Sequence, residues 1–348
     1  MRRRTFLATA TGLAVGSGCL GPGASESDTL PPRVEAPPSG VYRPPARFEM
    51  VLVGVADAGP FRVGLLYSHP VRFWEVVGEE TYLRDADPED SVHLLALAWD
   101  RETGVVCPEI GLTVEVERDG ELVAEEAVYA MASQSMGFHY GDNVALPADD
   151  AYDVTVAVGG LRLRRTGAFE GRFGDPASHT FTVEYTRAAR DALGVVRTER
   201  AGEHGALSLP ESPSVPAAVA PDPKPSWTVL DETTTADARL TGYLLTGDDA
   251  ARFDADRYLA VVAATPYNRL VLPSMGLRAT VERGGAAVFD SILTRTLDPD
   301  LGYHYGTAVP TLDGGDELVV ETLTPPQVAR HEGYETAFLS MPEARLRV

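Results

Sequence analysis

The chain has 348 residues, of which 44% are hydrophobic and 23% are charged, so it is long and apolar enough for two folded domains. Lysine and arginine together number 30 against 51 acidic residues, which gives a net charge of −21. So acidic a chain argues against a nucleic acid partner, because binding to phosphates needs positively charged side chains.

The first residues have the pattern of an export signal. Arginines at positions 2–4 precede an apolar run that ends near Val15, and this run is shorter than the about 20 residues that cross a bilayer. We predict a twin-arginine signal over residues 1–18. The small residues before Cys19 resemble a lipobox, which predicts that Cys19 is lipidated and anchors the protein to the outer face of the cell membrane. An ordinary cleavage site beside an uninvolved cysteine is the alternative.

Two segments rich in proline divide the remaining chain. Residues 19–45 are small, polar and proline-rich, which predicts a disordered tether. Residues 191–225 contain a second such tract and predict a linker. The expected domains are therefore 46–190 and 226–348. Only Cys107 remains beside Cys19, so we expect no structural disulfide, and Cys107 at a strand end is expected to be buried.

The dominant hydrophobic period within both domains is two, which is typical of β-strands. Strands are predicted in the first domain over 61–67, 92–99, 112–117, 152–158 and 181–185, and in the second over 258–263, 277–282 and 317–321. A hairpin turn is expected at 118–121, and one helical turn near 186–192. The predicted fold is all-β, with two tandem immunoglobulin-like β-sandwiches after the signal and tether.

The two domains contain an internal repeat. When the chain is shifted by 165 positions without a gap, 12 of the 34 residues from 108 to 141 are identical to residues 273 to 306. The conserved spacing ends in a shared motif, His139-Tyr140-Gly141 in the first copy and His304-Tyr305-Gly306 in the second. A period this long indicates duplicated domains rather than a solenoid.

The repeated motif admits two interpretations. In the structural one, Gly141 supplies a positive φ at a strand corner and Tyr140 hydrogen-bonds back across it, as in a tyrosine corner. In the other, His139 is a metal ligand, because imidazole with thioether suits copper and similar ions, and His93 on the strand over 92–99 offers a second imidazole. We found no catalytic motif, and we expect a binding protein rather than an enzyme.

Residues on and around these strands resemble the P19/Tp34 family of extracytoplasmic iron-transport proteins. The similar segments are Ser91-Val-His93-Leu94, a methionine upstream of Gly137-Phe-His139-Tyr140-Gly141-Asp142-Asn143, and the strand over 152–156. The segments 70–74, 133–139 and 164–173 resemble the haloarchaeal branch of that family. The acidic composition, in which Lys224 is the only lysine, resembles that of proteins from salt-loving archaea. The resemblance covers residues 45–187 well and 227–348 thinly.

The resemblance implies a site of three histidines and one methionine that binds copper or iron. His93 and His139 match two of the family's ligands, and either Met131 or Met136 would be the thioether. The later histidine is missing from the first domain, whereas the second domain retains His304 and has His331 near the missing position. Neither domain alone has a full set, so one hypothesis is that the halves are complementary, either with one weakened site each or by facing each other as a pseudo-dimer within one chain.

The sequence therefore predicts an exported, lipid-anchored protein that binds a copper or iron ion in support of iron uptake, with a membrane iron permease as a possible partner. The alternative is a cell-surface β-sandwich interaction module that retains the fold without the metal. The two differ in a geometric expectation. A shared ion requires the imidazoles of His93 and His139 within roughly 5 Å of each other and a methionine sulfur nearby.

Overall fold

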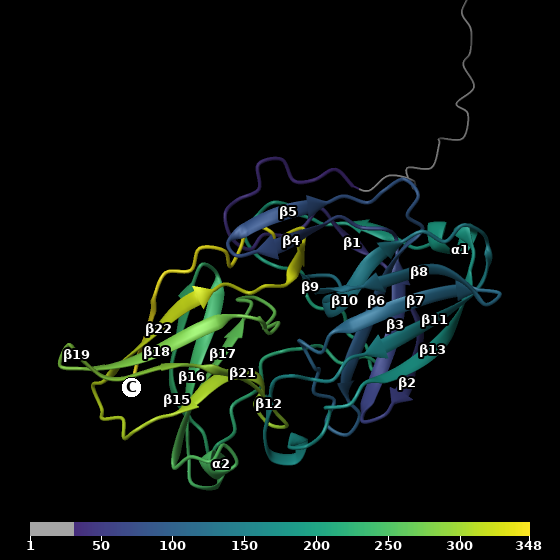
Figure 1. Cartoon of the computed structure of the whole chain (residues 1–348). Helices are drawn as coiled ribbons and strands as arrows, with labels where there is room; N and C mark the ends of the chain where they lie inside the picture. The colour runs from purple at the N-terminus through teal and green to yellow at the C-terminus, as the bar shows by residue number, and fades with distance from the viewer. Residues whose placement is uncertain (1–30) are drawn as a thin grey trace, which may run out of the picture.

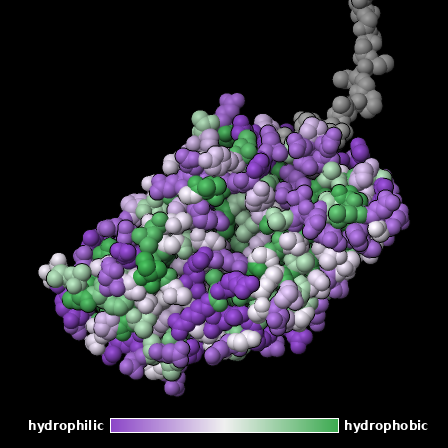
Figure 2. Space-filling view, in the orientation of Figure 1, coloured by the Kyte–Doolittle hydropathy of each residue, from purple (hydrophilic) through white to green (hydrophobic). Residues whose placement is uncertain are grey.

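The computed structural model describes residues 31–348, and the predicted signal and Cys19 lie outside this range. The described chain is almost entirely β-structure arranged in two units (Figure 1), which confirms the predicted all-β fold. Within the described residues no helix is long and apolar enough to span a membrane. Hydrophilic residues cover most of the face shown in Figure 2, in keeping with the acidic composition.

The first unit packs an eight-stranded sheet against a four-stranded one. The larger sheet has the order β2-β3-β6-β10-β9-β23-β4-β5, and the smaller has the order β13-β11-β7-β8. The strands that this unit contributes are β2 Val51–Ala58, β3 Phe61–Ser68, β4 Phe73–Val77, β5 Glu80–Arg84, β6 Val92–Asp100, β7 Leu112–Arg118, β8 Glu121–Ala127, β9 Tyr129–Ser133, β10 Gly137–Val144, β11 Asp150–Val158, β12 Arg164–Arg165 and β13 Ala177–Tyr185.

The second unit packs a six-stranded sheet against a four-stranded one. The orders are β12-β20-β21-β17-β16-β15 and β19-β18-β22-β24. Its strands are β15 Thr228–Thr235, β16 Ala238–Thr246, β17 Arg257–Ala264, β18 Gly276–Arg283, β19 Ala286–Ile292, β20 Thr294–Asp298, β21 Gly302–Ala308, β22 Glu317–Thr324, β23 Ala329–His331 and β24 Ala344–Arg347.

Each strand that the hydrophobic pattern predicted is present, whereas other long strands, among them β2, β10, β15 and β16, were not predicted. Strand β11 alternates between exposed and buried side chains, whereas every residue of β6 is buried, in agreement with its continuous apolar run. The predicted helical turn near 186–192 is α1 (Arg187–Asp191), and the short helices η1 (Gly167–Phe169) and α2 (Asp248–Ala251) were not predicted. Cys107 is free and fully buried, as expected.

Each unit inserts one short strand into the larger sheet of the other. Strand β23 of the second unit lies parallel to β9 and antiparallel to β4 of the first, and β12 of the first unit lies parallel to β20 of the second. The two insertions are equivalent under the internal repeat. In the first, Arg164 pairs with Thr296, and in the second, Ala329 pairs with Met131. The shift of 165 positions takes Arg164 to Ala329 and Met131 to Thr296. One continuous apolar cluster includes residues of both units.

The segments expected to be a tether and a linker are packed in their described parts. Val41 and Tyr42 are buried, and the backbone from residue 40 to 42 pairs with that of residues 333–336. Strand β1 (Ala46–Phe48) pairs with β14 (Val195–Arg197) of the expected linker. The prediction of disorder is therefore wrong for residues 31–45. Few apolar side chains suffice here because backbone hydrogen bonds to residues 333–336 add to the burial of Val41 and Tyr42.

Candidate metal centre

Three histidines and one methionine converge where β23 enters the first unit. His93 lies on β6, His139 on β10 and Met131 on β9, and the register places Met131 directly opposite His139. Strand β23 continues this row, because Ala329 is the neighbour of Met131 and His331 follows two residues later. Two units far apart in sequence therefore supply one cluster, as the hypothesis of complementary halves predicts.

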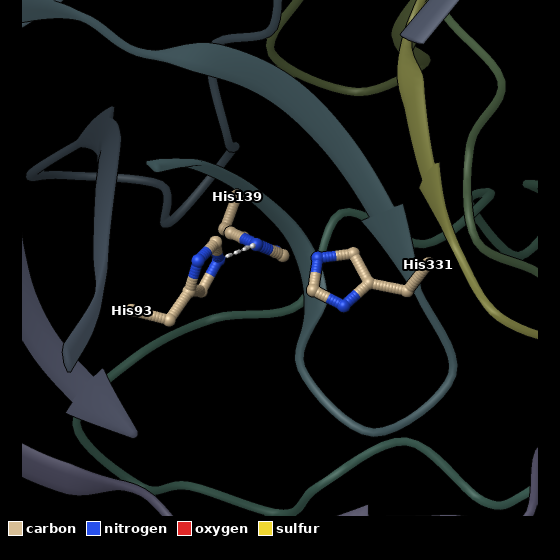
Figure 3. Close-up of side chains that lie close together, drawn as sticks. All are labelled: His93, His139 and His331. Carbon is tan, nitrogen blue, oxygen red and sulfur yellow. Dashed lines mark hydrogen bonds between the residues drawn. The ribbon is translucent and has the colours of Figure 1, made fainter. Parts of the chain in front are cut away.

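The potential ligand atoms are close enough to bind one ion. One nitrogen from each of His93, His139 and His331 lies within 4.8 Å of those of the other two. The Nε2 atoms of His93 and His139 are 3.4 Å apart, and Nε2 of His331 lies 3.3 Å from Sδ of Met131. The three rings meet nearly edge-on, with His331 approaching from the side opposite His93 (Figure 3). The geometric expectation for His93, His139 and a methionine sulfur is confirmed.

The hydrogen bonds of His93 and His139 turn two lone pairs toward each other. Nδ1 of His139 contacts the carbonyl oxygen of Gly137 at 3.2 Å, so this nitrogen carries the proton and Nε2 does not. Nδ1 of His93 lies 3.0 Å from Oδ1 of Asn143. The orientation of Asn143 is fixed by both backbone groups of Val71, since its Nδ2 donates to the carbonyl and its Oδ1 accepts from the amide. Without an ion or a proton between them, the two Nε2 lone pairs repel each other.

The separation of the Nε2 atoms of His93 and His139 fits two ligands of a tetrahedral ion. Metal–nitrogen bonds of about 2.0–2.1 Å at a tetrahedral angle place two nitrogens about 3.4 Å apart, which matches the separation of the two Nε2 atoms. Three neutral imidazoles and a thioether form a soft, uncharged donor set. Phe73 and Ala329 pack around Met131 and hold the thioether in place. The residues present therefore fit a transition-metal ion.

Burial keeps the three imidazoles neutral. It lowers the pKa of His93 from 6.5 to about 4, and it lowers the pKa of His139 to about 3, where the neighbouring His93 adds to the effect. The pKa of His331 is also lowered well below its usual value, first by burial and then by His139 and His93. All three rings therefore offer a lone pair at neutral pH, and an incoming ion does not have to displace their protons.

Gly141 leaves the space in which the ring of His93 lies. A Cβ atom at this position would be 2.8 Å from Nε2 of His93 and 2.8 Å from the carbonyl oxygen of Leu94. The equivalent Gly306 leaves room for Tyr258, whose hydroxyl oxygen would be 2.2 Å from an added Cβ. The glycine of the repeated motif is thus required by the side chain on the neighbouring strand.

The structural interpretation of the motif holds in part. The hydroxyl of Tyr140 accepts a hydrogen bond from the amide of Ile110, and Tyr305 does the same with Met275 in the second unit. The tyrosine therefore fastens a strand to a loop in both copies. The positive φ, however, was assigned to the wrong glycine. It belongs to Gly137 (74°), which begins β10 after a tight turn, and not to Gly141.

Two of the six predicted ligands lie elsewhere. Met136 lies in the turn before β10 and packs with Val71 and Leu95 in a small apolar cluster. His304 is fully buried in the second unit, with Nε2 3.2 Å from the hydroxyl of Tyr258 and Nδ1 bonded to the carbonyl of Gly302. The structure thus brings together His93, Met131, His139 and His331, and separates Met136 and His304 from them.

The second unit has the same corner with different side chains. The shift of the internal repeat takes His93, Met131 and His139 to Tyr258, Thr296 and His304, and it takes Thr166 to His331. Thr166 donates to the buried carboxylate of Asp298, which Arg252 also contacts at 3.0 Å. Of the four donors, the second unit retains only the histidine, His304. Tyr258 and Thr166, at two of the other positions, make hydrogen bonds instead. Within the described chain, the cluster containing His331 is the one group of three or more potential metal ligands.

Residues 224–347 match a protein family described as a domain of unknown function (DUF7350). Among solved structures, the chain is similar to FetP of uropathogenic E. coli expressed in the periplasm, with 16% identity, a TM-score of 0.30, and coverage of 40% of this chain and 97% of FetP. A copper-bound variant of FetP gives 18% identity, a TM-score of 0.31, and coverage of 40% and 99%. No curated protein matches.

Proposed function

We propose that this chain is an exported protein that binds one transition-metal ion between its two units, at His93, Met131, His139 and His331. One observation carries the proposal. The Nε2 atoms of His93 and His139 lie 3.4 Å apart with their lone pairs directed at each other, and the side chains of Met131 and His331 lie beside them. A purely structural histidine would direct both ring nitrogens to hydrogen-bond partners, as His304 does.

The donor set favours copper over iron. Imidazole suits copper and iron alike, whereas the thioether of Met131 is a soft ligand that selects cuprous copper. All four donors are uncharged and buried, so an ion of low charge is the least costly to enclose. Cuprous copper satisfies both conditions. Four protein donors would leave a tetrahedral ion no open position for a substrate, so the arrangement supports binding rather than catalysis.

The cellular role rests on the sequence. The predicted twin-arginine signal and Cys19 support a protein anchored by lipid at the outer face of the cell membrane. The family resemblance supports a role in iron uptake, with a membrane iron permease as the partner and with copper as the bound ion. The internal repeat and the reciprocal strand insertion support descent from a duplicated domain that once paired as a dimer.

The proposal is tested by metal titration of the chain without its signal. We expect one cuprous ion per chain, weaker binding of ferrous iron, and loss of tight binding in His93→Ala, His139→Ala and His331→Ala. The matched control is His304→Ala, which removes an equally buried histidine and should leave the stoichiometry at one. If the three variants bind copper as the unaltered chain does, the metal proposal fails and a metal-free interaction module remains.

A further inference from the structure

The four donors lie below the surface, so an ion must reach them through the protein. Of these four, His331 borders a surface pocket of about 430 Å³, open solvent included. The pocket is also lined by Arg72, Glu332 and the hydroxyl-bearing Ser133 and Ser135, and by prolines of the N-terminal segment. The pocket therefore connects solvent to the outer side of the metal centre.

Glu332 lies in this pocket immediately after the ligand His331. Its Oε1 accepts a hydrogen bond from the amide of Val34 at 2.8 Å, which fixes the position of the carboxylate. Its Oε2 is 3.6 Å from Nη1 of Arg72, a distance typical of an ion pair rather than of a hydrogen bond. One carboxylate oxygen is thus anchored by the backbone, and the other is held only by a displaceable cation.

Arg72 is weakly held in turn. Its Nε is buried and makes no hydrogen bond, and the nearest carboxylate oxygen to it is Oδ1 of Asp85 at 3.7 Å. The guanidinium lies between the carboxylates of Asp85 and Glu332, close to both and well bonded to neither. A small movement toward Asp85 would complete one pair and expose Glu332 to the pocket.

We propose that Glu332 is an outer ligand through which the cation reaches His331, and that Arg72 is a competing internal cation that closes this route. The inference rests on the proposed function. An arriving ion meets the carboxylate oxygen of Glu332 and the Ser135 hydroxyl, Arg72 shifts toward Asp85, and the ion passes to the imidazole of His331. Oxygen donors hold a soft ion loosely and imidazole with thioether holds it tightly, so the donor chemistry favours inward transfer.

Glu332 and Arg72 should have opposite effects on the rate of loading. Removing the negative charge in Glu332→Gln weakens the attraction for the ion at the pocket, and we expect loading about tenfold slower, at the low end of what focused charge contributes to association rates. Arg72→Gln removes the competing cation and should accelerate loading. Both differences should shrink in molar salt, where the Debye length is about 3 Å.

The experiment mixes the metal-free chain with cuprous ion, supplied as its acetonitrile complex without oxygen, and quenches the reaction with a chelator that captures unbound copper. Loading rates are compared for the unaltered chain, Glu332→Gln, Arg72→Gln and the control Glu79→Gln, which removes one exposed acidic charge outside the pocket lining. Equilibrium stoichiometry is measured on the same samples, and circular dichroism verifies their folding.

A slower Glu332→Gln and a faster Arg72→Gln, with stoichiometry of one in both, support the inference. If Glu332→Gln loads as fast as Glu79→Gln, or if Arg72→Gln loads more slowly than the unaltered chain, the inference is overturned. If the unaltered chain binds no copper at equilibrium, the proposed function fails instead, and the two failures are thus separate.

Discussion

At the scale of single residues, the neutral state of the buried imidazoles links the metal centre to pH. Burial lowers the pKa of His93 to about 4 and that of His139 to about 3, whereas the pKa of both histidines in the unfolded chain is about 6.5. Below pH 6.5 the unfolded state therefore binds more protons than the folded state, and protonation favours unfolding. The stability contributed by these groups is present above pH 6.5 and is lost as the pH falls toward 4.

We therefore expect the free energy of unfolding of the metal-free chain to decrease between pH 6.5 and 4. Each depressed histidine contributes up to about 1.4 kcal/mol per pH unit in this range. Urea unfolding at a series of pH values measures the slope, and His139→Gln should reduce it. The half-buried His179, outside the centre, provides the control variant His179→Gln. Equal slopes in the two variants would contradict the assignment of the pH dependence to the centre.

Gly141 provides a second prediction at this scale. In Gly141→Ala, the new Cβ collides with Nε2 of His93 and with a backbone oxygen that cannot move freely. We expect a destabilisation of about 1–3 kcal/mol, as for other overpacked cores, together with a large loss of copper affinity. Gly314→Ala is the matched control, because an added Cβ there has no neighbour within 4 Å. Denaturant unfolding and copper titration measure the two effects, and unaltered copper affinity in Gly141→Ala would contradict the prediction.

At the scale of elements, the short strand β23 depends on Arg330. This fully buried guanidinium donates to the carbonyls of Pro326, Ala337 and Phe338, and it lies over the ring of Phe338. It therefore closes the loop that presents His331 to the first unit. A strand of three residues has few bonds of its own, so the loop determines where the histidine lies.

Replacing Arg330 should disturb the metal centre without changing any ligand. In Arg330→Met, three buried carbonyls lose their donor, and we expect a loss of about 3 kcal/mol or more in unfolding free energy and weaker copper binding. Arg345→Met on β24 is the control, because this half-exposed arginine makes surface ion pairs worth about 0–1 kcal/mol. Urea unfolding measures the stability of both variants, and copper titration measures their affinity. Equal unfolding free energies of Arg330→Met and Arg345→Met would count against this role of Arg330.

The length of an element limited how well the sequence predicted it, although length alone was not sufficient, because the eight- and nine-residue strands β15 and β16 were not predicted. Strands such as β6 and β11 have enough residues for a hydrophobic period, and their positions were predicted. Strands β12 and β23, with two and three residues, have no period, so their exchange between units could not be predicted. The choice of Met131 over Met136 also required the structure, because it depends on the register of β9 with β10. His331 became a candidate because the family resemblance implies a later histidine ligand and the second copy has a histidine near the position that lacks one in the first.

At the scale of the whole molecule, two equivalent corners carry different side chains, and the proposed function assigns them different roles. The corner with β23 has four metal donors, whereas the corner with β12 joins Thr166, Asp298 and Arg252 by hydrogen bonds. Both corners join the same two units through backbone pairing, and under the proposed function a bound ion would add metal–ligand bonds to that pairing at the first corner alone. Binding of an ion by both units also links metal affinity to their association.

This divergence predicts opposite behaviour for two equally buried histidines. His304→Ala removes the acceptor of the Tyr258 hydroxyl and leaves a cavity, so it should lower the stability of the metal-free chain while one copper ion still binds. His331→Ala should abolish tight copper binding, and with it the rise in unfolding temperature that saturating copper gives the unaltered chain. Thermal unfolding with and without copper measures both variants. Two results would contradict the division of roles between the corners. One is that copper no longer raises the unfolding temperature of His304→Ala, and the other is that copper still raises that of His331→Ala.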